Sequence, residues 1–137
     1  PLLLCAALVG CTFAVPAKSL PVSEVLRNME ELDGKEVYVV GWVGDCWSRN
    51  CNLYNTRSEA NLSLQNDVHE RLDNRELNIT ITGWTPVSYF QGKRVLVTGR
   101  VNATCWRGRI PDENGNQFFC MDARDDIEDP SVRHLIS

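Results

Sequence analysis

LDGKEVYVVGWVGDCW, at residues 32–47, is repeated with substitutions as FQGKRVLVTGRVNATCW at residues 90–106. Both copies have an apolar residue, then Gly-Lys, alternating valines, a glycine and a closing Cys-Trp, with one extra residue before the second Cys-Trp. Mostly β-branched residues at every second position predict a strand with one buried face. Two distant copies do not make a solenoid. We therefore expect two equivalent long strands in one small barrel.

Each repeat also carries a glycine on the face that its valines define. Gly41 and Gly99 occupy equivalent positions in the two copies. A glycine inside a strand usually marks a bulge or a tight bend, which a closing barrel requires. The two glycines are therefore expected to point into the barrel.

Before the first repeat, apolar residues at helical spacing predict a helix of two to three turns between Pro21 and Asp33. The apolar stripe consists of Val22, Val25, Leu26, Met29 and Leu32. Residues 18–21 are expected to be a short linker.

Between the repeats, alternation predicts short strands at residues 52–54, 62–64 and 77–82. A turn or a single helical turn is expected at residues 85–91, which contain Pro86.

After the second repeat, Pro111 to Gly115 carries a strong turn signal, which predicts a hairpin with a returning strand at residues 117–121. Residues 122–137 are expected to form an acidic, solvated and partly disordered tail. Its last apolar residues, Val132, Leu135 and Ile136, are candidates to pack back on the domain.

This arrangement of a helix, two GKxVxVxGxV strands, short middle strands and a final hairpin resembles the small bacterial OB-fold proteins described as anticodon-binding-like. The resemblance covers about residues 22–122, and CWSRNCNLY with the later cysteines is similar to a secreted, uncharacterised branch. It implies an all-β, OB-like five-stranded small barrel with a short N-terminal helix, whose outer face and loops can bind oligonucleotides or oligosaccharides. No binding residue carries over residue by residue.

Residues 1–17 are expected to be a signal segment, and residues 18–137 a single OB-like domain. The run PLLLCAALVG at residues 1–10 has the length and composition of a secretory signal, too short to span a bilayer. A buried N-terminal helix is the alternative.

Two processing sites compete within this segment. Leu8-Val9-Gly10-Cys11 resembles the bacterial lipobox and predicts acylation of Cys11. Val15-Pro16-Ala17 instead offers a site for an ordinary signal peptidase. The chain is therefore expected to be exported, either to the periplasm or outer membrane as a lipoprotein or as a soluble secreted protein.

Cysteine chemistry supports export. An even number of cysteines in an exported domain predicts disulfides, here among Cys46, Cys51, Cys105 and Cys120. Cys46 and Cys51 enclose a short loop, and Cys105 and Cys120 lie symmetrically about the predicted 111–115 turn. We therefore expect Cys46–Cys51 and Cys105–Cys120. A zinc site is the alternative, but the spacing is unusual for zinc and no His lies near either pair.

The formal net charge of −4 disfavours nucleic acid as a partner, and equally a membrane surface bound through a basic face. Neither His69 nor His134 lies in a recognisable catalytic or metal motif, and we expect no enzyme activity, cofactor or metal. The acidic run at 122–129 lacks the ligand order of an EF-hand. Three Asn-x-Ser/Thr sequons, at Asn61, Asn78 and Asn102, are expected to occur by chance.

Candidate binding residues follow from the Cys-Trp that ends each repeat. These are Trp47, Arg49, Trp106, Arg107 and Arg109. An aromatic ring beside a guanidinium can stack a sugar or base and hold an anionic group. Alternatively, each Trp packs over its neighbouring disulfide.

Three functions remain open at this point. The first is a non-catalytic module that binds an unidentified protein or polymer of the cell envelope, anchored in the membrane if Cys11 is acylated. The second is a structural envelope lipoprotein without a ligand, and the third is a secreted enzyme.

Overall fold

The two sequence repeats form the longest strands of the protein, and they lie side by side. The computed structural model describes residues 15–47, 50–65, 78–82, 87–108, 112–116 and 126–136. The first repeat forms β2 (Glu36–Trp47) and the second forms β5 (Arg94–Val101), which pair antiparallel from Glu36–Arg100 to Trp42–Arg94. The prediction of two equivalent strands in one sheet is therefore confirmed.

The Gly-Lys pair before each strand forms the same turn in both repeats. Gly34 and Gly92 have φ angles of 77° and 75°, a conformation that favours glycine. The Gly34 N–H donates to the Val101 carbonyl at 2.8 Å, and the Gly92 N–H donates to the Val43 carbonyl at 2.7 Å. Each turn therefore tethers the start of one repeat strand to the end of the other.

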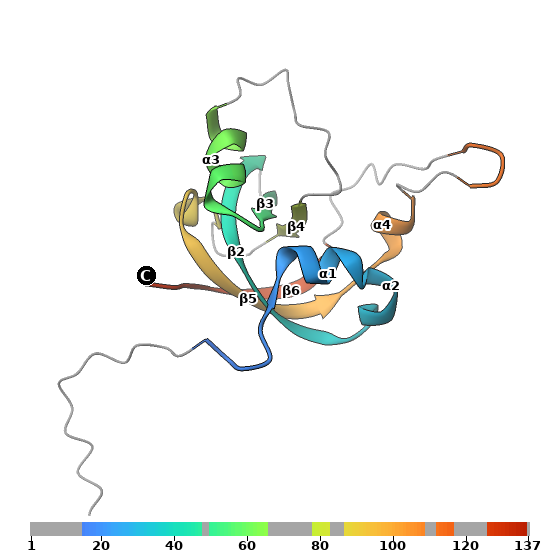
Figure 1. The fold of residues 1–137 in the computed structure, drawn as a ribbon, viewed down its shortest axis with the longest axis horizontal. Helices are drawn as coiled ribbons and strands as arrows, with labels where there is room; N and C mark the ends of the chain where they lie inside the picture. The colour runs from blue at the N-terminus through green and yellow to red at the C-terminus, as the bar shows by residue number, and fades with distance from the viewer. Residues whose placement is uncertain are drawn as a thin grey trace, which may run out of the picture.

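Three further strands close the sheet into a barrel (Figure 1). These are β3 (Asn50–Tyr54), β4 (Asn78–Thr82) and β6 (Ile127–His134). The order is β2-β3-β4-β6-β5, and β5 pairs again with β2, so the five strands form a closed barrel. A sixth, two-residue strand, β1 (Leu20–Pro21), pairs parallel with β2. The protein is thus a small, OB-like all-β barrel, as predicted.

Short helices complete the fold. They are α1 (Val22–Arg27), α2 (Met29–Leu32), α3 (Arg57–Gln65), η1 (Val87–Phe90) and α4 (Thr104–Gly108). The predicted N-terminal helix is confirmed but is broken at Asn28 into α1 and α2. Its Val22, Val25 and Met29 are fully buried in the same hydrophobic core as the inward valines of β2 and β5. The helical turn expected before the second repeat is η1.

Gly41 and Gly99 lie where neighbouring elements leave no room for a side chain. A Cβ at Gly41 would meet Leu53 Cγ at 2.7 Å and Val22 Cγ2 at 2.8 Å. A Cβ at Gly99 would meet Ile127 Cγ2 at 2.5 Å. The absence of a side chain at these positions is what lets α1 and β6 pack against the repeat strands.

The acidic tail prediction is wrong for residues 127–134, which form β6 and close the barrel between β4 and β5. Ile127 is fully buried and Val132 packs against the core, while Glu128 lies opposite Arg100. Leu135 is buried as well, whereas Ile136 is 91% exposed. Asp129, at a φ of 48°, lies beside the shift in β5–β6 register, and this irregularity hides the strand alternation in the sequence.

Two predicted strands are helices instead. Leu62 and Leu64 lie on α3, which begins with a reciprocal capping box: the Glu59 N–H donates to Thr56 Oγ1, and the Thr56 N–H donates to Glu59 Oε2. This local cap outweighs a two-residue alternation. Residues 104–108 form α4 rather than the first strand of a hairpin.

The turn expected at residues 111–115 is present, with the Gly115 N–H donating to the Asp112 carbonyl at 2.9 Å. The predicted returning strand at 117–121 lies outside the described residues. The expected linker at 18–21 is partly wrong, because Leu20 and Pro21 pair with Val39 and Val40 of β2.

Candidate functional site

The two Cys-Trp ends of the repeats lie apart. Because β2 and β5 are antiparallel, their C-terminal ends point toward opposite ends of the barrel. The backbone of Trp47 pairs with Asn50 at the β2–β3 hairpin, whereas Trp106 lies on α4, partly buried against the core. The side chain of Trp47, and the whole of Arg49 and Arg109, lie outside the described residues. The strand register therefore places the backbone of Trp47 and the beginning of α4 at opposite ends of the β2–β5 ladder.

The Cys46–Cys51 disulfide is present and joins directly opposed residues of β2 and β3, with Cα atoms 4.0 Å apart. Cys51 is buried in the barrel core. The bond therefore links β2 and β3 at the turn end of their hairpin.

Cys105 is also disulfide-bonded. It lies on α4 and not, as predicted, on the first strand of a hairpin. Cys120, the predicted partner, and Cys11, the predicted acylation site, lie outside the described residues.

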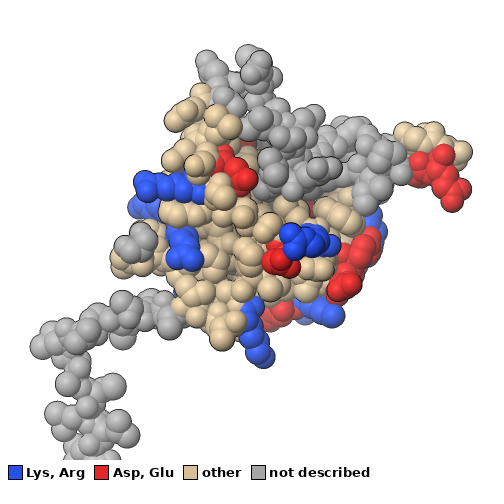
Figure 2. All heavy atoms as spheres, in the orientation of Figure 1, with Lys and Arg blue, Asp and Glu red and all other residues tan. Residues whose placement is uncertain are grey.

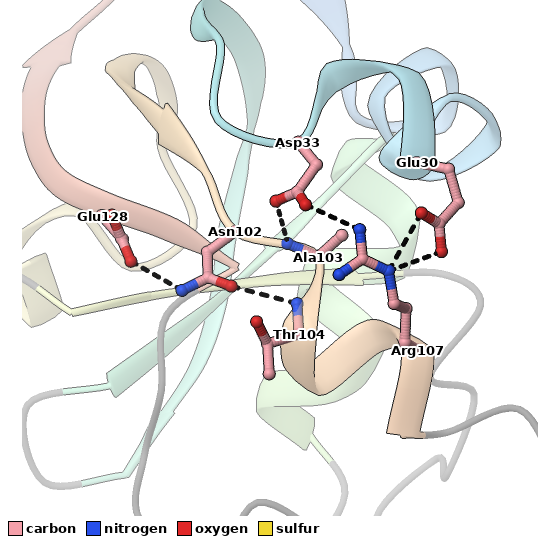
Figure 3. Close-up of polar contacts among 7 residues, drawn as sticks. All are labelled: Glu30, Asp33, Asn102, Ala103, Thr104, Arg107 and Glu128. Carbon is pink, nitrogen blue, oxygen red and sulfur yellow. Dashed lines mark hydrogen bonds and ion pairs between the residues drawn. The ribbon is translucent and has the colours of Figure 1, made fainter.

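Arg107 fastens α4 to the N-terminal helices (Figure 3). Its Nε donates to Glu30 Oε1 at 2.8 Å, and its Nη2 donates to Asp33 Oδ2 at 2.6 Å. The Ala103 N–H donates to the other oxygen of Asp33 at 3.0 Å. The Ala103 hydrogen bond, and then Arg107, hold the pKa of Asp33 below its ordinary value, while both carboxylates raise the pKa of Arg107. Arg107 thus already has two anionic partners within the chain.

Asn102 extends these contacts to β6. Its Oδ1 accepts from the Thr104 N–H at 3.0 Å, and its Nδ2 donates to Glu128 Oε1 at 2.6 Å. As Figure 3 shows, the turn between β5 and α4 is held by Asp33 on one side and by Asn102 on the other. These hydrogen bonds explain how α4 is positioned. The side chain of Asn102, the asparagine of one sequon, is hydrogen-bonded within the protein.

A second cluster holds α3 on the outside of β2 and β3. The Tyr54 hydroxyl donates to Asp45 Oδ1 at 2.7 Å, and Asn52 Nδ2 donates to the same carboxylate. The Asp45 N–H donates to Ser63 Oγ of α3 at 3.0 Å. Burial, and then the hydrogen bond to Asp45, raise the pKa of Tyr54.

Gly44 permits this packing, because a Cβ there would collide with Ser63 and with the ring of Tyr54. Part of the outer barrel face, where the OB resemblance implies ligand binding, is therefore covered by α3.

A partly exposed cluster of one aromatic and three basic residues lies beside α3. The guanidinium of Arg57 lies 5.6 Å from the ring centroid of Trp42, within cation–π range. Arg94 lies directly opposite Trp42 on β5, and the Lys93 carbonyl accepts from the Val43 N–H at 3.0 Å. We call Trp42, Arg57, Lys93 and Arg94 the Trp42 patch. Within the described part of the chain, none of its three cations forms an ion pair.

Sequence reasoning missed the Trp42 patch, although one signal was available. Trp42 and Arg94 both occupy outward positions in the alternation of their repeats. Alternation alone, however, does not reveal that the two strands pair with these residues opposite each other, nor that α3 brings Arg57 over the ring.

Charge is distributed unevenly over the molecule. In the face that Figure 2 shows, blue side chains gather on the left, over α3 and the start of β5, and red side chains are frequent on the right. The acidic residues of α2 and of the 112–116 turn belong to the right-hand side in Figure 1. The negative net charge therefore coexists with a locally basic surface.

No protein-family model, curated protein or solved structure matches this chain. Across the described ranges, no helix is long and apolar enough to cross a membrane. The described side chains also include no group of three or more His, Cys, Asp or Glu that could hold a metal ion.

Proposed function

We propose that this protein is an exported, non-catalytic binding module that holds an anionic partner on the Trp42 patch. The observation that carries the proposal is the Arg57–Trp42–Arg94 arrangement. The Arg57 guanidinium lies over the indole ring of Trp42, and Arg94 is the residue directly opposite Trp42 on the neighbouring strand. Neither arginine forms an ion pair with a carboxylate of the described chain. A stacked guanidinium keeps its donors in a fixed plane, which suits phosphate, sulfate or carboxylate groups.

Export is supported by cysteine chemistry. Cys46 is bonded to Cys51, and Cys105 is disulfide-bonded too. Structural disulfides persist mainly in oxidising compartments. The apolar run at residues 1–10 is consistent with a secretory signal.

The binding proposal is tested with heparin as a soluble polyanion probe. The double variant Arg57→Gln/Arg94→Gln should lower heparin affinity at least about tenfold and weaken its dependence on salt. Lys35→Gln is the matched control, because Lys35 is an exposed cation just before β2, seven residues along the chain from Trp42. Equal heparin affinity in the wild type and the double variant would refute the role of the patch.

Mass spectrometry of the mature N-terminus tests the processing. A diacylated chain beginning at Cys11 is the expected result for a lipoprotein. A chain beginning at Lys18 would indicate ordinary signal peptidase cleavage.

A structural envelope protein without a ligand is the second candidate. It is favoured by α3, which occupies part of the outer face of β2 and β3 through Gly44 and Ser63. This candidate predicts that the wild type does not bind heparin measurably and that variants of the patch change only stability.

A further inference from the structure

Exposed apolar side chains border the Trp42 patch. Tyr89 is 75% exposed and Ile136 is 91% exposed. Tyr89 precedes Phe90, whose ring lies 6.3 Å from that of His134, and the Lys93 N–H donates to the Phe90 carbonyl. The start of β5 and the end of β6 are thereby joined.

The position of Ile136 follows from the same contacts. The Leu135 N–H donates to the Arg94 carbonyl at 2.8 Å, so Ile136 follows a residue that is bonded to the patch itself. Leu64 of α3 is 41% exposed and lies beside the turn before β5. Its Cδ1 is 4.0 Å from the position that a Cβ on Gly92 would occupy. We call Leu64, Tyr89 and Ile136 the apolar rim.

Single exposed apolar residues are common on soluble proteins. Here the exposed residues come from three separate segments, each of which contacts Gly92, Lys93 or Arg94 at the start of β5. Surfaces that bind at a membrane–water interface typically combine aromatic, aliphatic and basic side chains, as this one does.

The termini of the described chain point to the same side. In Figure 1 the dark-blue first segment of the described chain and the C label both lie on the left of the view, where the gold ribbon of β5 also begins. Cys11 is four residues before Val15, a span of at most about 14 Å in extended chain. An acyl anchor on Cys11 would therefore hold this side of the barrel close to the bilayer.

We propose that the anionic partner of the Trp42 patch is a lipid surface, which the protein contacts through the patch and the apolar rim together. This inference rests on the proposed function, since it names the partner of the same site. Acidic headgroups face Arg57, Lys93 and Arg94, while Tyr89 and Ile136 enter the interface. A basic patch adds membrane affinity to that of a lipid anchor and holds this side of the barrel against the membrane surface.

The experiment measures partition of the full chain carrying Cys11→Ser, so that no acyl group contributes. Vesicles of phosphatidylcholine with phosphatidylglycerol are compared with vesicles of phosphatidylcholine alone, because the apolar N-terminal run contributes equally to both. We expect tighter partition to the anionic vesicles. Arg57→Gln and Arg94→Gln should each reduce this preference roughly fivefold.

Tyr89→Ser/Ile136→Ser should reduce partition to the anionic vesicles by roughly fivefold or more through lost apolar burial. Its matched control is Leu62→Ser, since Leu62 is 47% exposed and lies about 200° around α3 from Leu64. Lys35→Gln controls for the loss of one charge. Both controls should partition like the parent protein.

Two results would overturn the inference. One is equal partition to neutral and anionic vesicles by a protein that still binds heparin through Arg57 and Arg94, which leaves the proposed function intact. The other is a loss in Lys35→Gln as large as in Arg94→Gln, which would indicate non-specific attraction. If neither heparin nor vesicles respond to the patch variants, the proposed function fails too.

Discussion

Val39 of β2 and Val97 of β5 face each other at the centre of the ladder that joins the two repeats. Val37 and Gly41 of the first repeat correspond to Val95 and Gly99 of the second. In the ladder, Val37 faces Gly99 and Gly41 faces Val95, so each valine faces the glycine of the other repeat. The two tethering turns obey the same exchange, with Gly34 bonded to Val101 and Gly92 to Val43. The sequence repeat is thus a local two-fold relation in space.

Replacing Gly41 by Ala should destabilise the protein by about 1–3 kcal/mol, because the new Cβ would overpack the barrel. Besides Leu53 and Val22, the Tyr54 carbonyl oxygen lies only 2.9 Å from that position, and a backbone atom has little freedom to move. Urea denaturation measures the change. Thr98→Ala, on the outer face of β5, is the control and should cost less. A neutral Gly41→Ala would show that the close approach is not required.

The Cys46–Cys51 bond should contribute about 2 kcal/mol, since it closes a loop of sequence separation 5 and mainly restricts the unfolded chain. The double variant Cys46→Ala/Cys51→Ala, compared with the parent by denaturation under non-reducing conditions, gives this value. An unchanged unfolding midpoint would contradict the estimate.

Non-reducing peptide mapping should find Cys105 joined to Cys120. The bond at Cys105 is consistent with this pairing, although α4 and not a hairpin strand presents the sulfur. A peptide that joins Cys46 to Cys105, or four free thiols in exported protein, would contradict both assignments.

Asp33 should make stability depend on pH in the acid range. Its folded pKa is lowered below 3.8, so the folded state favours the charged form and the stabilisation is fully present above that value. It is lost as the pH falls through the lowered pKa. The difference in Tm between the parent and Asp33→Asn should therefore be constant near neutral pH and shrink below about pH 4.

Glu31→Gln is the control for that experiment. Glu31 is an exposed acid on α2, the helix that ends just before Asp33, and the structure gives it no hydrogen bond or ion pair with the described residues. A Tm difference for Asp33→Asn that does not change with pH would argue against the carboxylate contacts with Ala103 and Arg107.

Trp106→Ala should destabilise the protein by about 2–4 kcal/mol, because the ring packs against the core beside Cys105. Thermal melts of this variant and of Trp42→Ala compare two tryptophans of which only Trp106 belongs to the core cluster. A larger fall in Tm is expected for Trp106→Ala. An unchanged Tm would revive Trp106 as a binding residue.

Local patterns decided much of the fold. Alternating valines and the Gly-Lys turns specified β2 and β5, and spaced apolar residues specified the helix that packs its Val25 and Met29 into the core. The short loop between Cys46 and Cys51 was enough to identify their disulfide. These features depend on neighbours within a few residues, and for that reason the sequence displays them directly.

Tertiary structure decided the rest. In the sequence alone, residues 127–134 resemble an acidic tail. In the fold they pair with β4 and β5, and the burial of Ile127 outweighs the low strand propensity of Asp129-Pro130. The Trp42 patch likewise exists only because antiparallel pairing sets Arg94 opposite Trp42 and α3 carries Arg57 over its ring. The sequence by itself determined which residues alternate inward and outward. Long-range strand register determined which outward residues meet, because a ladder joins residues that no local pattern connects.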